Sequence, residues 1–73
     1  MYRLRVDRLL DAAKVMGDKT GYAIARRTKI AESSVYRILG GKAQPDLISM
    51  LRIAEVYDVR IEGLMERIPE EAA

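Results

Sequence analysis

The chain contains two short helical patterns, over residues 20–28 and 32–39, that are separated by only three residues. Each pattern repeats its apolar side chains at the three- and four-residue spacing of an amphipathic helix. The connection Lys29-Ile30-Ala31 is so short that we expect the second helix to cross the first steeply, with Ile30 filling the corner between them. Ala25 is small where such a crossing needs close approach of the two backbones. This pair of helices constrains the fold more than any other feature of the sequence.

The rest of the chain predicts three more helices. The strand signal is weak, because Val, Ile and Tyr recur at helical rather than alternating spacing. The additional helices are expected over residues 3–16, 46–57 and 61–67. The apolar stripes expected to face the core are Tyr2, Val6, Leu9, Leu10 and Ala13 in the first helix, Gly21, Ile24, Ala25 and Thr28 in the second, Ala31, Val35 and Ile38 in the third, Leu47, Met50, Leu51, Ala54 and Tyr57 in the fourth, and Ile61, Leu64, Met65 and Ile68 in the fifth.

Small and polar residues mark the helix boundaries. Gly17 is expected to end the first helix, with Asp18 or Thr20 as the N-cap of the second. Gly40-Gly41 ends the third helix, since glycine tolerates the left-handed conformation common past a helix end. Pro45 precedes the fourth helix and Asp46 is a suitable N-cap for it. The sequence therefore predicts an all-α fold of five helices in one domain, residues 1–73, in which residues 67–73 form a frayed acidic tail.

Composition excludes several classes of function. The 73 residues leave no room for two cores. The absence of Cys and His excludes disulfides, thiolate zinc sites and catalysis by imidazole. The carboxylates are scattered singly, so we expect no enzyme, no metal and no cofactor. No apolar run approaches the roughly 18 residues of a membrane span, and the charged N-terminus does not resemble a signal peptide. We therefore expect a cytoplasmic protein.

Charge is distributed unevenly within the net +2. Residues 1–42 hold ten Lys and Arg against four Asp and Glu, whereas residues 43–73 hold three against seven. A polarised molecule of this kind can turn its basic half toward a polyanion. The alternative is an ordinary solvated surface of mixed charge.

The helix at 32–39 has a polar face that can read base edges. At about 100° per residue, Glu32, Ser33, Tyr36 and Arg37 cluster on one side, opposite the apolar stripe. Arg suits guanine, Glu suits the amino group of cytosine, Ser suits several partners, and a ring can contact the thymine methyl group. The alternative is a surface helix whose polar face is only solvated.

Taken together, these features resemble the lambda-repressor-like DNA-binding domains of the Cro/Xre family. The family pattern is matched, in order and spacing, by Thr20, Ile24-Ala25, Ile30, Gly41-Lys42, Pro45, Leu47, Met50-Leu51, Ile53-Ala54, Val59 and Leu64. The resemblance implies a compact five-helix domain in which helices 2 and 3 form a helix–turn–helix. It also implies a sequence-specific regulator of double-stranded operator DNA, a repressor of phage, plasmid or bacterial type, acting in the cytoplasm.

Four positions depart from that pattern. Lys29 replaces a Gly, so we expect left-handed strain or a changed path in the turn. Ala31 replaces a Ser or Thr cap, at a cost of about 1 kcal/mol unless Glu32 or Ser33 compensates. Leu39 replaces a Glu, and Gly21 replaces a Gln that often touches a phosphate; backbone amides at the helix start can still bind an anion there.

The resemblance and the helical wheel together assign roles. Base readout is expected from Glu32, Ser33 and Arg37, with Tyr36 in support; Glu32 alternatively only stabilises the helix dipole. Arg26 shares the outward stripe of Tyr22 and is preferred over Arg27. The expected phosphate contacts are Lys19, Thr20, Tyr22, Arg26, Lys42 and, more weakly, Lys29.

Two alternatives remain open at this stage. The stripe of the last helix either closes the core, the favoured interpretation, or exposes Met65 and Ile68 as a homodimer contact, in which case the operator is palindromic. The second function considered is a protein-interaction module, such as an antitoxin, that uses its acidic C-terminal half. The short tail argues against that function. We expect no small-molecule ligand and no membrane partner.

Overall fold

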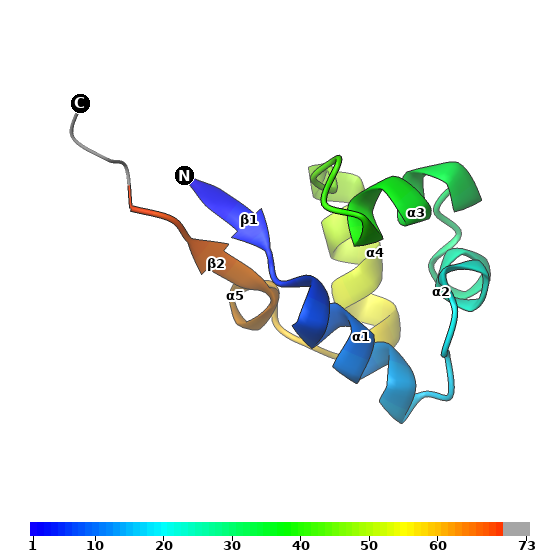
Figure 1. Ribbon diagram of the computed structural model, residues 1–73. Coiled ribbons are helices and arrows are strands. Elements are labelled where there is room, and N and C mark those ends of the chain that lie inside the picture. Colours follow the sequence, from blue (N-terminus) through cyan, green and yellow to red (C-terminus); the bar gives the residue numbers. More distant parts are fainter. Residues whose placement is uncertain (70–73) are drawn as a thin grey trace.

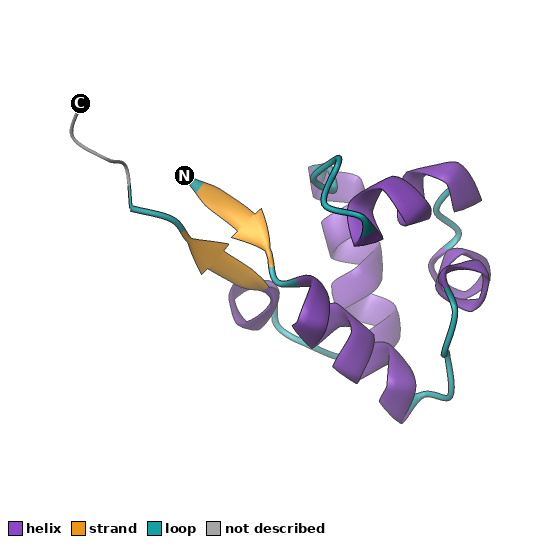
Figure 2. Cartoon of the chain, in the orientation of Figure 1, coloured by secondary structure: helices purple, strands orange, loops and turns teal. Residues whose placement is uncertain are grey.

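The computed structural model describes residues 1–69, and this part of the chain folds mainly into five helices (Figures 1 and 2). The order of elements is β1 (Tyr2–Leu4), α1 (Val6–Val15), α2 (Gly21–Thr28), α3 (Glu32–Leu39), α4 (Leu47–Tyr57), α5 (Ile61–Leu64) and β2 (Met65–Arg67). The helices pack together, while β1 and β2 pair as a ribbon that extends from one side of the helical body (Figure 2). Among the described residues, no helix is long and apolar enough to cross a membrane.

Side-chain caps begin α2 and α4 where the sequence indicated. The amide of Ala23 donates to Thr20 Oγ1 at 3.1 Å, so Thr20 rather than Asp18 is the N-cap of α2. The amide of Ser49 donates to Asp46 Oδ1 at 2.8 Å, and this bond lowers the pKa of Asp46. These bonds satisfy amides that have no partner within the helix.

The core is formed mainly by the inner faces of α1, α2, α3 and α4. The predicted stripe of α2 is confirmed in full, since Gly21, Ile24, Ala25 and Thr28 are all buried. Val35 and Ile38 of α3 are buried as expected, although Ala31 is exposed. The buried apolar residues are Leu4, Leu9, Ala13, Ile24, Ala25, Ile30, Val35, Ile38, Met50, Ile53, Tyr57 and Leu64.

The predicted stripe of α4 is wrong in part. Leu47 and Leu51 are 69% and 47% exposed, whereas Ile53 is 1% exposed. Apolar residues occur nearly all around this helix, so their spacing does not decide which side faces inward. The burial of Met50 and Tyr57 fixes the helix so that Leu47 and Leu51 point outward. Similarly, Leu10 of α1 is 41% exposed.

The prediction of an all-helical chain is wrong at both ends. β1 and β2 pair in antiparallel fashion with Tyr2 opposite Arg67, so neither segment is helical and Tyr2 is 65% exposed. Arg3 and Glu66 form an ion pair at 3.1 Å across the ribbon. The amide of Ile68 donates to the carbonyl of Met1 at 2.8 Å, so this part of the predicted frayed tail is paired. Pairing between the two ends of a chain leaves no local signal. Residues 70–73 of the predicted tail lie outside the described residues.

Candidate nucleic-acid interface

The turn between α2 and α3 has the left-handed backbone expected from Lys29. Lys29 has φ of 60°, and its amide donates to the carbonyl of Ala25 at 2.9 Å. For a side chain with Cβ this conformation costs roughly 1 kcal/mol. Arg52 of α4 donates to the carbonyl of Lys29 at 3.1 Å, and Ile30 is buried in the corner, as predicted. The hydrogen bond from Arg52 and the burial of Ile30 therefore hold the strained turn in place.

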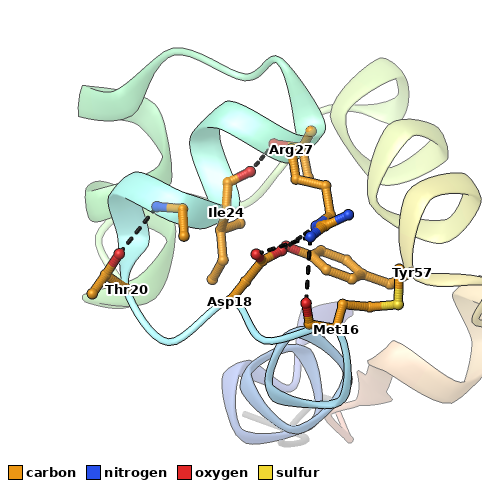
Figure 3. A network of polar contacts seen from close by, with 8 residues as sticks. Met16, Asp18, Thr20, Ile24, Arg27 and Tyr57 are labelled. Carbon is orange, nitrogen blue, oxygen red and sulfur yellow. Dashed lines mark hydrogen bonds and ion pairs between the residues drawn. The ribbon is translucent and has the colours of Figure 1, made fainter.

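A polar cluster anchors α2 on its inner side (Figure 3). The guanidinium of Arg27 donates to both carboxylate oxygens of Asp18, and the hydroxyl of Tyr57 donates to Asp18 at 2.8 Å. Arg27 also donates to the carbonyl of Met16 at 3.3 Å. These contacts join the α1–α2 connection, α2 and α4. Sequence reasoning missed this Asp18–Arg27–Tyr57 cluster, because its members lie far apart along the chain and no motif joins them.

The cluster shifts the pKa of all three of its members. The hydrogen bond with Asp18 raises the pKa of Arg27. The hydrogen bond from Arg27 holds the pKa of Asp18 below its usual value, against the opposing effect of burial. Burial, together with the adjacent carboxylate, raises the pKa of Tyr57. At neutral pH the carboxylate is therefore charged and the phenol is protonated, the state in which all of these hydrogen bonds form.

The outward face of α3 presents the four side chains named from the sequence. Val35 and Ile38 fix the helix to the core, and Glu32, Ser33, Tyr36 and Arg37 are all exposed. Figure 1 shows α3 beside α2 at the edge of the helical body. Within residues 1–69, none of these four side chains makes a hydrogen bond or ion pair. Their polar groups are therefore available to a partner outside the chain.

The start of α3 has the missing cap that the sequence indicated. Ala31 is the N-cap residue and makes no side-chain cap hydrogen bond. Over the described residues, neither Glu32 nor Ser33 supplies one. The carboxylate of Glu32 in the first turn still interacts favourably with the helix dipole, so this alternative role is compatible with its exposed position.

The side chains expected at phosphates surround α2 and the ends of α3. Lys19 and Thr20 precede α2, Lys29 lies in the turn, and Lys42 follows α3, and all four are exposed. The Thr20 hydroxyl already serves as the helix cap. In α2, Arg26 donates to the hydroxyl of Tyr22 at 3.1 Å, and its guanidinium carbon lies 5.7 Å from the centre of that ring. Tyr22 therefore orients Arg26 on the outer side of α2.

The sequence pattern did not select one exposed polar residue of α3. Ser34 is exposed and lines a shallow hollow together with Arg37, next to Asp46 at the start of α4. The helical wheel places Ser34 about 60° from Arg37, toward the apolar stripe, which is why spacing alone did not select it. Its hydroxyl extends the polar surface of α3 toward the loop before α4.

At the opposite end of the molecule, the residues considered for a dimer lie outside any helix. Leu64 is buried, so this position closes the core. Met65 is partly buried in β2 and packs against the core, and Ile68 follows that strand. The predicted continuous helical stripe is therefore wrong beyond Leu64.

The described residues form a small, mainly helical domain with a polar outward face on α3. The model of one family, described as the Cro/C1-type HTH DNA-binding domain, matches residues 5–70, and the chain belongs to this family. The resemblance seen in the sequence is thereby confirmed. Comparison with curated proteins and with solved structures gives no match.

Proposed function

We propose that α2 and α3 form the helix–turn–helix of this domain and that α3 enters the major groove. The observation that carries this proposal is the division of α3 into two faces. Val35 and Ile38 are buried, while the polar groups of the opposite face have no partner within residues 1–69. In a helix–turn–helix, the second helix meets base edges and the first crosses the backbone.

Three residues of α3 are proposed to read bases. Arg37 offers paired donors that suit guanine O6 and N7, Glu32 accepts from a cytosine amino group, and Ser33 bonds to several bases. Tyr36 lies on the same exposed face and is proposed as a supporting contact. The shared exposure of these residues and their lack of protein partners support this assignment.

Phosphates on either side of the groove are proposed to meet the flanking cations. Lys19 and Thr20 precede α2, Tyr22 and Arg26 lie on it, Lys29 is in the turn and Lys42 follows α3. Phosphate contacts set the position of a protein on the duplex and make its affinity depend on salt. The pairing of Arg26 with Tyr22 supports a fixed direction for that guanidinium.

The proposed biological role is sequence-specific regulation of transcription, as a repressor that occupies its operator in the cytoplasm and blocks polymerase. Membership of a DNA-binding family supports the general role. A homodimer through Met65 and Ile68 stays a prediction, and it would require a palindromic operator with half-sites about one helical turn apart.

A second candidate function is a protein-interaction module of the antitoxin kind. Leu47, Ile48 and Leu51 are all exposed on α4, an observation that favours some protein contact. Salt separates the two functions, because binding through several Lys and Arg contacts to DNA weakens steeply as salt increases.

The test is selection of the purified protein on random duplex DNA, followed by sequencing of the bound pool. The proposal predicts an enriched motif, and an inverted repeat would indicate a dimer. Retention without enrichment would contradict sequence-specific readout. No retention at low salt would contradict DNA binding and favour the interaction module.

A further inference from the structure

Tyr36 does not extend freely from α3, because its ring rests against the first turn of α2. A Cβ atom built on Gly21 would lie 2.7 Å from Cε1 and 2.9 Å from Cζ of Tyr36. Real Cβ atoms essentially never approach another atom so closely. The ring therefore occupies the space that a side chain at position 21 would fill. The contact joins α2 and α3 on the surface that we propose to face DNA.

The position of the ring determines where its hydroxyl lies. Cζ, which carries the hydroxyl, is one of the two ring atoms nearest to Gly21, so the hydroxyl lies beside the start of α2. Tyr36 is 49% exposed, and its hydroxyl makes no hydrogen bond within residues 1–69. Lys19 and Thr20, at the same end of α2, are exposed as well. Within residues 1–69 the hydroxyl is thus a free donor at the start of α2.

We propose that Tyr36 donates a hydrogen bond to a DNA phosphate instead of reading a base, and that Gly21 is the position that makes this possible. The inference rests on the proposed function, in which α2 crosses the DNA backbone. Tyrosine hydroxyls are common donors to phosphate oxygens. The base-reading surface is then narrower than the sequence indicated, and consists of Glu32, Ser33 and Arg37.

The first test replaces Tyr36 with Phe, which keeps the ring and removes only the hydroxyl. Loss of a hydrogen bond to a charged group is expected to lower affinity about tenfold. The loss should be equal on the selected site and on mismatched DNA. The salt slope should not change, because a neutral hydroxyl releases no counterion. A loss confined to the selected site, with relaxed preference at one base pair, would show that Tyr36 reads a base; unchanged affinity would show that the ring only packs.

The second test replaces Gly21 with Ala, which places a methyl group where the ring now lies. The ring is the far end of a flexible side chain, so it should swing away while the domain stays folded. Affinity should fall as it does in Tyr36→Phe, and the double variant should lose little more than either single variant. Gly63→Ala is the matched control, because nothing lies within 4 Å of a Cβ added there. Unchanged affinity of a folded Gly21→Ala variant would overturn the role of Gly21.

The wild-type protein separates this inference from the proposed function. If it shows no salt-sensitive binding to DNA, the proposed function fails and the inference fails with it. If it binds, and Tyr36→Phe binds equally well, the proposed function stands and the inference alone is wrong. Thermal melts of each variant show whether a change in affinity comes from unfolding.

Discussion

Arg26 and Arg27 are neighbours in α2, yet they belong to two regions of the molecule that have different hydrogen-bond partners. On the inner side, Arg27 binds the carboxylate of Asp18, which also accepts from Tyr57 (Figure 3). On the outer side, Arg26 donates to the hydroxyl of Tyr22 in its own helix, and the neighbouring face of α3 makes no side-chain hydrogen bond or ion pair within residues 1–69. In the inner region the charge of Arg27 holds α2 in place. In the outer region the charge of Arg26 is available to a ligand.

Residue type alone does not distinguish an anchoring arginine from a binding one. What separates the two is a shift of one position along the helix, about 100° around its axis. Arg27 reaches the α1–α2 connection and α4, whereas Arg26 reaches solvent. Exchange of roles between them is therefore not expected, and single substitutions should affect stability on one side and DNA affinity on the other.

The largest effect on stability is expected from Asp18→Asn. This substitution removes the negative charge to which both Arg27 and Tyr57 donate hydrogen bonds. Hydrogen bonds to a charged, largely buried group contribute the most to stability. The free energy of unfolding should fall by about 2 kcal/mol in urea denaturation. Asp11→Asn, at an exposed position of α1, is the control and should change stability by less than about 0.5 kcal/mol. Equal stability of both variants would contradict the anchoring role of the cluster.

The variants Arg27→Ala and Arg26→Ala compare the two arginines directly, because each removes the same type of side chain from the same helix. Arg27→Ala should lower the free energy of unfolding by less than Asp18→Asn does, since its side chain is partly exposed and solvent weakens the ion pair. Arg26→Ala should leave stability nearly unchanged, weaken binding on every DNA sequence and reduce the salt slope by about one. Urea denaturation measures the stability of each variant, and binding at several salt concentrations measures its DNA affinity and salt slope. Similar behaviour of the two variants in both assays would break the distinction.

Acidification should weaken the inner region through Asp18. The pKa of Asp18 is lowered in the folded state, so its contribution to stability is complete above the unfolded pKa of about 3.9 and is lost as the pH falls through the folded value. Denaturation from pH 7 to pH 2 should therefore show the wild-type advantage over Asp18→Asn shrinking below about pH 4. A constant difference across this range would mean that the charge of Asp18 does not stabilise the fold.

The smallest effect is expected at the start of α3, where Ala31→Ser supplies the absent cap. The hydroxyl can accept from a free amide of the first turn, as Thr20 does in α2. Stability should rise by about 0.5–1 kcal/mol, without a change in base preference. The melting temperature and a repeated selection on random DNA measure these outcomes. A rise in stability with an altered motif would mean that the capping position itself contributes to readout.

Local sequence patterns predicted where the helices lie better than they predicted how the helices and strands pack together. The stripe of α2 and the caps at Thr20 and Asp46 follow from spacing and residue type, which act over a few residues. The left-handed turn at Lys29 was expected from the family resemblance, in which a Gly occupies that position. The apolar residues around α4 did not reveal which face is buried. Pairing of β1 with β2 joins opposite ends of the chain, and no local pattern encodes it.

For the candidate site, the sequence predicted which side chains are exposed on α3. It did not predict what they touch. The Asp18–Arg27–Tyr57 cluster and the contact of Tyr36 with Gly21 arise only when α2, α3 and α4 pack together. Gly21, which replaces a Gln of the family pattern, gave one signal of this contact, since an absent side chain leaves room for a neighbour.

Arg37→Ala is the sharpest test of base readout by the outward face of α3. The measurement is the affinity of wild-type and variant protein for the selected site and for every single-base change in it. If Arg37 reads a base, the variant should lose roughly 1–3 kcal/mol of binding free energy on the selected site and show a relaxed preference at one base pair. An equal loss on all sequences would make Arg37 a phosphate contact and contradict base readout by this face.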